Sequence, residues 1–197
     1  MGARAIIEWH QSDSGSPALM QRNPWLSPST FLPALADFVH TARETGQTPT
    51  SELFRSWAAD HAHYVLGTDE TGEHRTFLAP GSDIQFHYLV QLQTVLRPHG
   101  RALLITARQR EMTLPGARGT WTITHQATTD EELYEAAAVL LTEQAARVRR
   151  LTAQGRGGPM PSPEDLDAHA RRLRDRIGQP RTEGTTPAGA AVPHDHP

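Results

Sequence analysis

Hydrophobic and polar positions alternate most clearly in the stretch from Ile84 to Gln126. From Ile84 onward every second residue is apolar as far as Leu92, and most of the residues between them are polar. This period of two is typical of a strand with one buried face. Gly-containing segments at 97–100 and 114–119 interrupt the stretch, so the pattern predicts three long strands joined by two tight turns.

A helix is the competing interpretation of the first of these strands. Ser82 or Asp83 would cap it and Gly100 would end it, because the apolar residues of 84–96 fit a helical period as well as a strand period. The run is enriched in aromatic and β-branched residues, which favours the strand. We therefore predict a strand over 84–96.

Helical periodicity occurs on both sides of this stretch. The best-marked helix begins after Thr129, which is predicted to form a capping box with Glu132, and runs to about Leu151 with one apolar stripe. The Gly- and Pro-rich segment 155–162 separates it from a last helix, which Ser162 caps. Shorter patterns predict the remaining elements: a strand over 3–10, helices over 29–46 and 50–61, and a hairpin over 64–80.

This order of elements predicts an α+β fold. We expect an antiparallel meander sheet of about five strands, with two N-terminal helices and a long C-terminal helix packed on one face. The order also resembles the helix-grip arrangement of START and polyketide-cyclase-like proteins, which implies a cavity between the sheet and the long helix. The predicted units are a compact α+β domain over 1–152, a linker over 153–162, an Arg-rich amphipathic helix over 163–178 and a disordered tail over 179–197.

The composition narrows the chemistry further. The chain has no Cys, which excludes disulfides, thiolate zinc sites and cysteine nucleophiles, and all 19 of its basic residues are Arg, which excludes lysine Schiff bases. No apolar run has the length of a membrane helix and the N-terminus lacks a signal-peptide core. We therefore expect a cytoplasmic location and no membrane contact, and we predict no cofactor, metal site or catalytic residue.

Two short runs resemble parts of known enzyme families. The run LRPHGRALLIT at 96–106 resembles the late turn and strand of class I methyltransferases, although no Gly-rich cofactor turn accompanies it. The pair His61 and His63 resembles the metal-binding histidines of HUH endonucleases, in which Tyr134 would be the nucleophile. Helical context at His61 would turn the two rings apart, so we expect no shared metal ion.

Charge is distributed unevenly along the chain. Residues 1–146 hold 10 Arg and 16 acidic residues, whereas residues 147–181 hold nine Arg and four acidic residues. Without a complete catalytic motif, this asymmetry favours a non-enzymatic accessory or adaptor protein that binds a partner protein, or associates with itself, through the Arg-rich helix. Weak, salt-sensitive binding to nucleic acid and docking of the helix on its own domain are the alternatives. The predicted partner-binding residues are Leu166, Ala170, Leu173, Ile177, Arg171, Arg172 and Arg174.

A second hypothesis places a small-molecule pocket between the sheet and the long helix, as in a binding protein or a cyclase-like enzyme. His87 and His125 lie on strand runs, and they are predicted to approach each other across the sheet. This hypothesis requires a closed apolar cavity of roughly 300–1,000 Å³, and a filled interface would contradict it. The predicted pocket residues are Phe86, His87, Tyr88, Glu111, Trp121 and His125.

Overall fold

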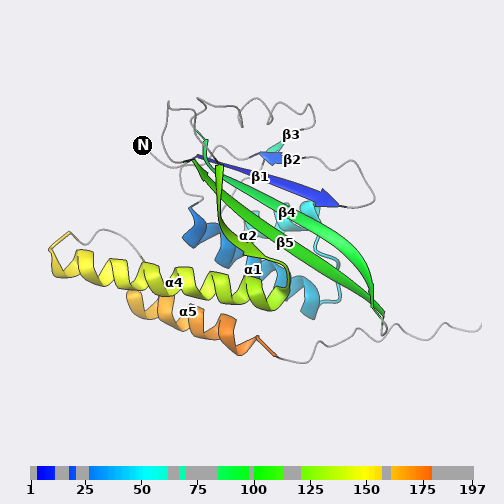
Figure 1. Cartoon of the computed structure of the whole chain (residues 1–197). Coiled ribbons are helices and arrows are strands. Elements are labelled where there is room, and N and C mark those ends of the chain that lie inside the picture. The colour runs from blue at the N-terminus through cyan, green and yellow to red at the C-terminus, as the bar shows by residue number, and fades with distance from the viewer. Residues whose placement is uncertain are drawn as a thin grey trace, which may run out of the picture.

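A computed structural model of the protein shows a sheet with helices on one of its faces (Figure 1). The described residues are 4–11, 18–20, 27–61, 67–69, 84–97, 100–112, 121–156 and 161–178. The strands are β1 (Arg4–Gln11), β2 (Ala18–Met20), β3 (Gly67–Asp69), β4 (Ile84–Arg97), β5 (Gly100–Met112) and β6 (Trp121–Ala127). The helices are α1 (Pro28–Glu44), α2 (Ser51–His61), α4 (Asp130–Ala153) and α5 (Pro163–Asp175). Among the described residues, no helix combines the length and the apolar character that crossing a bilayer requires.

The sheet is mixed, with the strand order β3-β2-β1-β4-β5-β6. β1 lies inside it and runs parallel to β4, with Ile7 beside Tyr88, whereas β4–β5 and β5–β6 are antiparallel pairs. The predicted α+β fold with a five-stranded antiparallel meander is therefore wrong. The described helices also contain more residues than the described strands, so this part of the chain is mainly helical.

The parallel pairing of β1 and β4 cannot be predicted from the hydrophobic pattern of either strand alone. Parallel neighbours require a long crossover, and here α1 and α2 lie on the chain between β1 and β4. Alternation along a strand identifies its buried face but not the strand beside it. The antiparallel prediction failed for this reason.

Two more local predictions have different outcomes. Residues 84–97 form a strand and not a helix, as the enrichment in aromatic and β-branched residues predicts. β3 pairs with β2, with Leu19 beside Thr68. The second run of the hairpin predicted over 64–80 lies outside the described residues.

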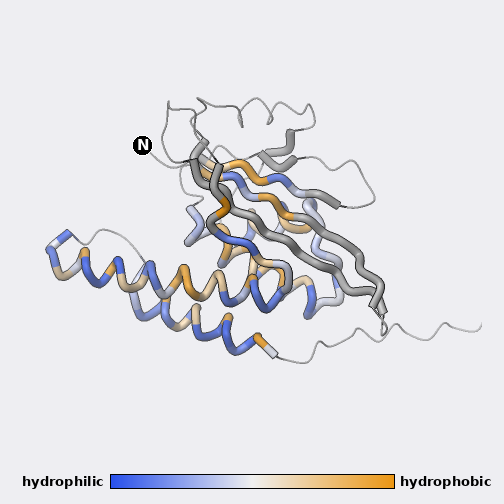
Figure 2. Tube along the Cα trace, viewed as in Figure 1, coloured by the Kyte–Doolittle hydropathy of each residue, from blue (hydrophilic) through white to orange (hydrophobic). Residues whose placement is uncertain are grey.

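An aromatic cluster fills the space between the centre of the sheet and the first two helices. Trp9 of β1 stacks on Phe54 of α2 with ring centroids 5.3 Å apart, and Phe31 of α1 lies 4.1 Å from Tyr88 of β4. Such contacts combine a large buried apolar area with favourable ring geometry. Figure 2 shows the apolar positions of β1, β4 and α1 gathered here. The cluster consists of Trp9, Phe31, Phe38, Phe54, Trp57 and Tyr88.

α1 and α4 pack directly on each other, and α5 lies on their outer side against α4 (Figure 1). α1 ends at Glu44, and Gly46 just after it has a positive φ of 67° and stops the helix. Gln47 N donates a hydrogen bond of 2.7 Å to Ala42 O across this end. An ion pair of 3.2 Å joins Arg43 Nε of α1 to Asp130 Oδ2 at the start of α4. The two helices are therefore connected independently of α5.

Candidate functional site

The start of α4 is fixed by the capping residues that the sequence predicts. Thr129 Oγ1 accepts a hydrogen bond of 3.1 Å from Glu132 N. The Glu132 carboxylate accepts hydrogen bonds from Thr128 Oγ1 at 2.7 Å and from Thr128 N at 2.6 Å, one residue earlier than in the predicted capping box. The hydrogen bond from the Thr128 side chain is the main reason that the pKa of Glu132 lies below its ordinary value. Thr128 and Thr129 thus join the end of β6 directly to the first turn of α4.

α5 is also capped as predicted, but its apolar stripe is covered by its own chain. Ser162 Oγ accepts a hydrogen bond of 3.0 Å from Asp165 N, and Pro163 occupies the first turn. Leu166, Ala170 and Leu173 are all buried in one core with residues of α1 and α4. Of the alternatives for this helix, the described structure therefore has the one in which it docks on its own domain.

Ion pairs along α4 fix the direction and register of α5. Asp167 lies near the start of α5 and pairs with Arg149 Nη2, near the end of α4. Arg174 Nε lies 3.2 Å from Glu135 Oε2, near the start of α4. The two helices are thus antiparallel, with opposite charges matched at both ends of the contact. We call α4, α5 and the turn between them the helical hairpin.

Asp37 of α1 binds the other side of α5. Its Oδ2 lies 2.8 Å from His169 Nε2, and its Oδ1 lies 2.7 Å from Arg176 Nη1. Burial raises the pKa of Asp37, but the hydrogen bonds with His169 and Arg176 outweigh burial, so the net pKa lies below the ordinary value of 3.8. One carboxylate therefore holds His169 of α5 and Arg176, directly after the end of α5, at once.

Two titratable residues beside Asp37 complete this environment. Burial, and after it the charge of Arg176, lowers the pKa of His40, whose Nε2 lies 3.1 Å from Glu44 Oε1. Burial, and after it the charge of Asp130, raises the pKa of Tyr134 to about 12. The Tyr134 side chain is also buried, at 6% exposure, in the core between α1 and α4, whereas the nucleophile that the HUH resemblance requires must reach its substrate.

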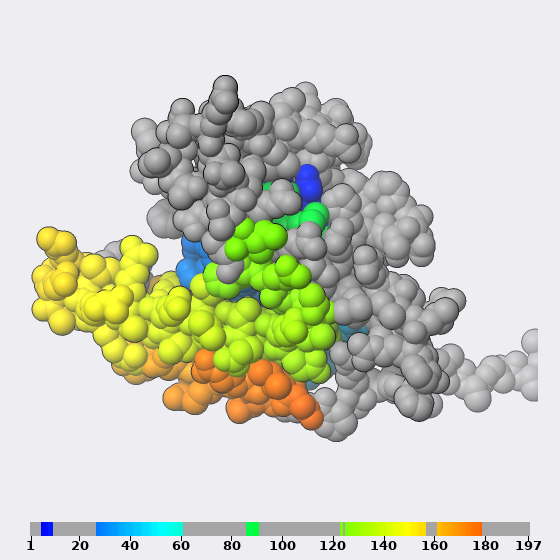
Figure 3. Space-filling model, in the orientation of Figure 1, coloured from blue at the N-terminus to red at the C-terminus, as the bar shows by residue number. Residues whose placement is uncertain are grey.

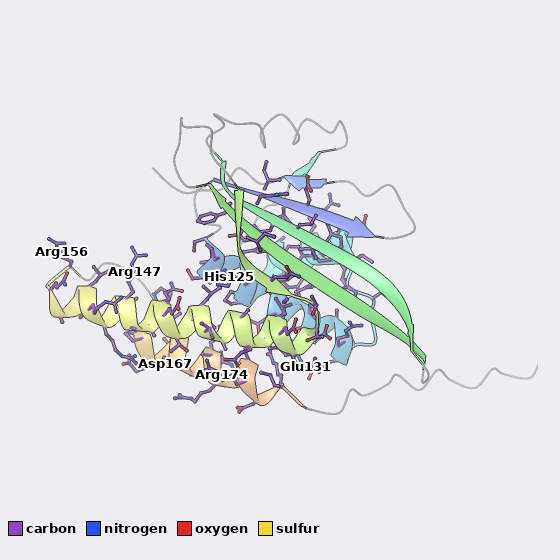
Figure 4. The ribbon with its side chains drawn as sticks, in the orientation of Figure 1. His125, Glu131, Arg147, Arg156, Asp167 and Arg174 are labelled. Atoms are coloured by element: carbon purple, nitrogen blue, oxygen red, sulfur yellow. The ribbon has the colours of Figure 1, made fainter. Side chains whose placement is uncertain are left out.

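The last turns of α4, yellow in Figure 3, project away from the rest of the described residues. Arg147 and Arg156 lie at this end, on or just after the last turns of α4 (Figure 4). They belong to a set, the exposed arginines of the helical hairpin that have no ion pair within the described residues. We call this set the outer arginines: Arg147, Arg150, Arg156, Arg171 and Arg172.

The residues predicted to bind a partner therefore separate into three groups. Leu166, Ala170 and Leu173 are buried, and Arg174 is paired with Glu135. Ile177 is 38% exposed beyond the end of α5. Only Arg171 and Arg172 among the predicted arginines are both exposed and without an ion pair in the described part of the chain.

The predicted pocket residues do not come together. Tyr88 belongs to the aromatic cluster, Phe86 lies half-buried beside it, and His87, on the opposite face of β4, lies 3.3 Å from Glu8 Oε2. His125 is in register with Tyr88 across β5 and shares the face of the buried Ala127, so His87 and His125 lie on opposite faces. The backbones of Glu111 and Trp121 lie in β5 and β6, but their side chains are outside the described residues.

The described structure does not test the cavity hypothesis. The aromatic cluster fills the space between the sheet and helices α1 and α2, whereas the hypothesis places the pocket between the sheet and the long helix. The cavity therefore stays a prediction. The methyltransferase-like run at 96–106 belongs to the antiparallel pair of β4 and β5, and not to a parallel cofactor-binding sheet.

Histidine spacing does not produce a metal site in the described residues. No group of three or more His, Asp or Glu side chains there is arranged to hold a metal ion. His61 is the last residue of α2, and His63 lies outside the described residues. Comparison of the chain with protein-family models, with curated proteins and with solved structures found no match.

Sequence reasoning missed the residues that hold α5. Asp37 lies 139 positions before Arg176, and Glu135 lies 39 positions before Arg174. The only signal was the pattern of α5 itself, in which His169 and Arg176 flank an apolar stripe that is too narrow to bury the helix alone. That pattern indicates that acidic partners are needed but does not identify them.

Proposed function

We propose that this protein is a non-enzymatic adaptor that binds an acidic surface of a partner protein through its outer arginines. The observation that carries the proposal is the division of the arginines in the helical hairpin. Arg149 and Arg174 pair with carboxylates within the hairpin and Arg176 pairs with Asp37 of α1, whereas the outer arginines are exposed without an ion pair in the described residues. Arginine is well suited to such contacts, because its planar guanidinium binds a carboxylate through two parallel hydrogen bonds.

The binding surface differs from the one that the sequence alone suggests. The apolar stripe of α5 is occupied in the docked helix, so it contributes no contact area to a partner in this state. The outer arginines lie instead on the exposed side of α5 and at the projecting end of α4 (Figure 4). A partner would therefore contact both helices of the hairpin.

The balance of charge favours a protein over nucleic acid as the partner. Residues 130–178 contain eight Arg and nine acidic residues, so the basic character of the C-terminal segment is largely cancelled when α4 is included. Exposed acids such as Glu143 and Asp175 lie among the outer arginines. A surface that follows a phosphate backbone is normally a continuous basic stripe, whereas mixed charges are typical of the rim of a protein interface.

The test compares two sets of substitutions in the full chain. One variant carries Arg147→Gln, Arg150→Gln and Arg156→Gln, and a second carries Arg171→Gln and Arg172→Gln. Arg55→Gln, at an exposed position of α2, is the matched control. Proteins captured from the native host by the wild-type chain are identified, purified and titrated against all variants at low and at physiological salt.

We expect both hairpin variants to bind the purified partner about tenfold more weakly at low salt, and the control to bind like the wild type. Each hairpin variant should also show a smaller dependence of affinity on salt. Unchanged affinity in both hairpin variants would refute the proposal. Duplex DNA that binds more tightly than any captured protein would also refute it.

A further inference from the structure

We propose that the groove between α1 and α4 is a docking site for an amphipathic helix of a partner protein, and that α5 is its removable, autoinhibitory occupant. This inference does not depend on the outer arginines. The groove takes a helix with apolar residues at positions i, i+4 and i+7, as Leu166, Ala170 and Leu173 are spaced in α5. We call it the helix groove.

The floor of the helix groove on α4 is formed by small residues. Glu135 and Arg149 both pair with α5, so the residues that share their face of α4 lie under α5. Ala138 and Ala145 are among them, at spacings of three and four residues, and both are fully buried. Alanine side chains allow a second helix to approach closely, which gives a groove whose shape is set by the backbone.

Charged residues on both edges of the helix groove specify the occupant. Asp37 binds a histidine and an arginine of α5 on one edge, and Glu135 binds an arginine on the other edge. Arg149 binds a carboxylate near the start of the occupant. A partner helix that fits must therefore carry an acid in its first turns and cations in its second half, at the positions that Asp167, Arg174 and Arg176 have in α5.

Three features make α5 separable from the rest of the molecule. It contributes only three buried apolar side chains, and its ion pairs with Arg149 and Glu135 are largely exposed and therefore weak. The chain leaves α4 at Gly155, which has a φ of 69°, and residues 155–162 contain three Gly and two Pro. The contact of α1 with α4, including the pair Arg43–Asp130, does not involve α5.

The test uses the full chain and a fluorescent peptide of residues 161–178. The variant Leu166→Asp with Leu173→Asp weakens the resident α5 but leaves every residue of the helix groove unchanged. We expect the peptide to bind this variant at least about tenfold more tightly than the wild-type chain, whose own α5 competes for the groove. A peptide with the same two substitutions is the control and should not bind.

A charge reversal then tests whether the helix groove selects a helix with the proposed arrangement of charges. Adding Asp37→Arg to the Leu166→Asp, Leu173→Asp chain should weaken its binding of the wild-type peptide about tenfold. Arg176→Asp in the peptide should restore most of the affinity. Failure of this exchange would refute the role of Asp37.

Three results would refute the proposal as a whole. In the first, the double aspartate variant loses the near-ultraviolet signal of its tryptophans, and the milder variant Leu173→Ala shows hydrogen exchange that accelerates equally in α5 and in the rest of the chain. Together these results would make α5 an integral part of the core. In the second, a folded variant does not bind the peptide. In the third, the wild-type chain has the mass of a dimer in solution and does not bind the peptide. The helix groove of each copy would then be occupied by α5 of the other copy.

Discussion

α2 and α5 are helices of similar length, 11 and 13 residues, but different forces hold them to the body. α2 contributes Phe54 and Trp57 to the aromatic cluster, in which Phe54 lies within 6.3 Å of four other rings. α5 contributes two leucines and an alanine, and it depends in addition on acidic partners such as Asp37. Packing of large rings is insensitive to pH and salt, whereas contacts between charges are sensitive to both. The comparison predicts that α2 unfolds with the whole molecule and that α5 detaches before it.

The largest effect is expected from the aromatic cluster. Phe54→Ala should lower the free energy of unfolding by about 3–5 kcal/mol, because it leaves a cavity among four rings. Urea unfolding followed by tryptophan fluorescence and by circular dichroism measures this, and both signals should shift together. Arg55→Ala, at the next and exposed position, should stay within about 0.5 kcal/mol of the wild type. A loss below about 1 kcal/mol for Phe54→Ala would contradict this account of α2.

The next largest effect is expected from Leu173→Ala, and it should be confined to α5. Leucine-to-alanine changes in a core lower stability by about 2–5 kcal/mol, but Leu173→Ala cannot remove more than the free energy with which α5 is docked. Beyond that limit the helix detaches and the rest stays folded. Hydrogen exchange should therefore accelerate in 163–175 and stay unchanged in 51–61. Equal acceleration in both helices would show that α5 and α2 belong to one cooperative unit.

Asp37→Asn should have a smaller effect that depends on pH. The pKa of Asp37 is lower in the folded protein than its ordinary value of 3.8, so the ionised carboxylate stabilises the fold above pH 3.8. As pH falls below 3.8 and through the lowered folded pKa, this contribution disappears. The wild type should therefore be more stable than the variant by about 1–3 kcal/mol at pH 7, and the two should converge in strong acid. A difference that stays constant from pH 7 to pH 2 would rule out the charge of Asp37 as the cause.

The smallest expected effect concerns the start of α4, on which both helix contacts depend. Thr129→Ala removes the acceptor for Glu132 N and should lower the free energy of unfolding by about 1 kcal/mol. Thr129→Ser keeps that acceptor and should restore most of the stability. Thermal unfolding of the three proteins at one protein concentration measures the difference. If Thr129→Ser destabilises the protein as much as Thr129→Ala, the methyl group of Thr129, and not its oxygen, is what stabilises the fold.

The sequence predicts well those features that depend on neighbouring residues. The strand over 84–97, the caps at Thr129 and Ser162 and the stop at Gly46 all follow from rules that act over about four residues. The pairing of β1 with β4 does not, because it depends on which strand lies beside which after a long crossover. This missing information is the reason that an antiparallel meander was expected.

The candidate site was predicted only in part, because contacts between distant elements are again missing from the sequence pattern. The exposed Arg171 and Arg172 belong to the predicted set, because they lie opposite the apolar stripe of α5. Arg174 belongs to it too, but it is turned to Glu135 on another helix. The pocket prediction expected His87 and His125 to approach each other across the sheet, and the register across β5 places them on opposite faces. Helix faces can be inferred from periodicity, whereas contacts between elements cannot.

The parallel pairing of β1 with β4 also has a consequence during protein synthesis. Ile7 cannot pair with Tyr88 until that residue has left the ribosome, so roughly 80 residues must be added before β1 finds its parallel neighbour β4. At about 5–20 residues per second this delay lasts on the order of 4 to 16 seconds. For that time Ile6, Ile7 and Trp9, all fully or almost fully buried in the final fold, are without their partners on β4. The nascent chain would then present a chaperone-binding segment in β1.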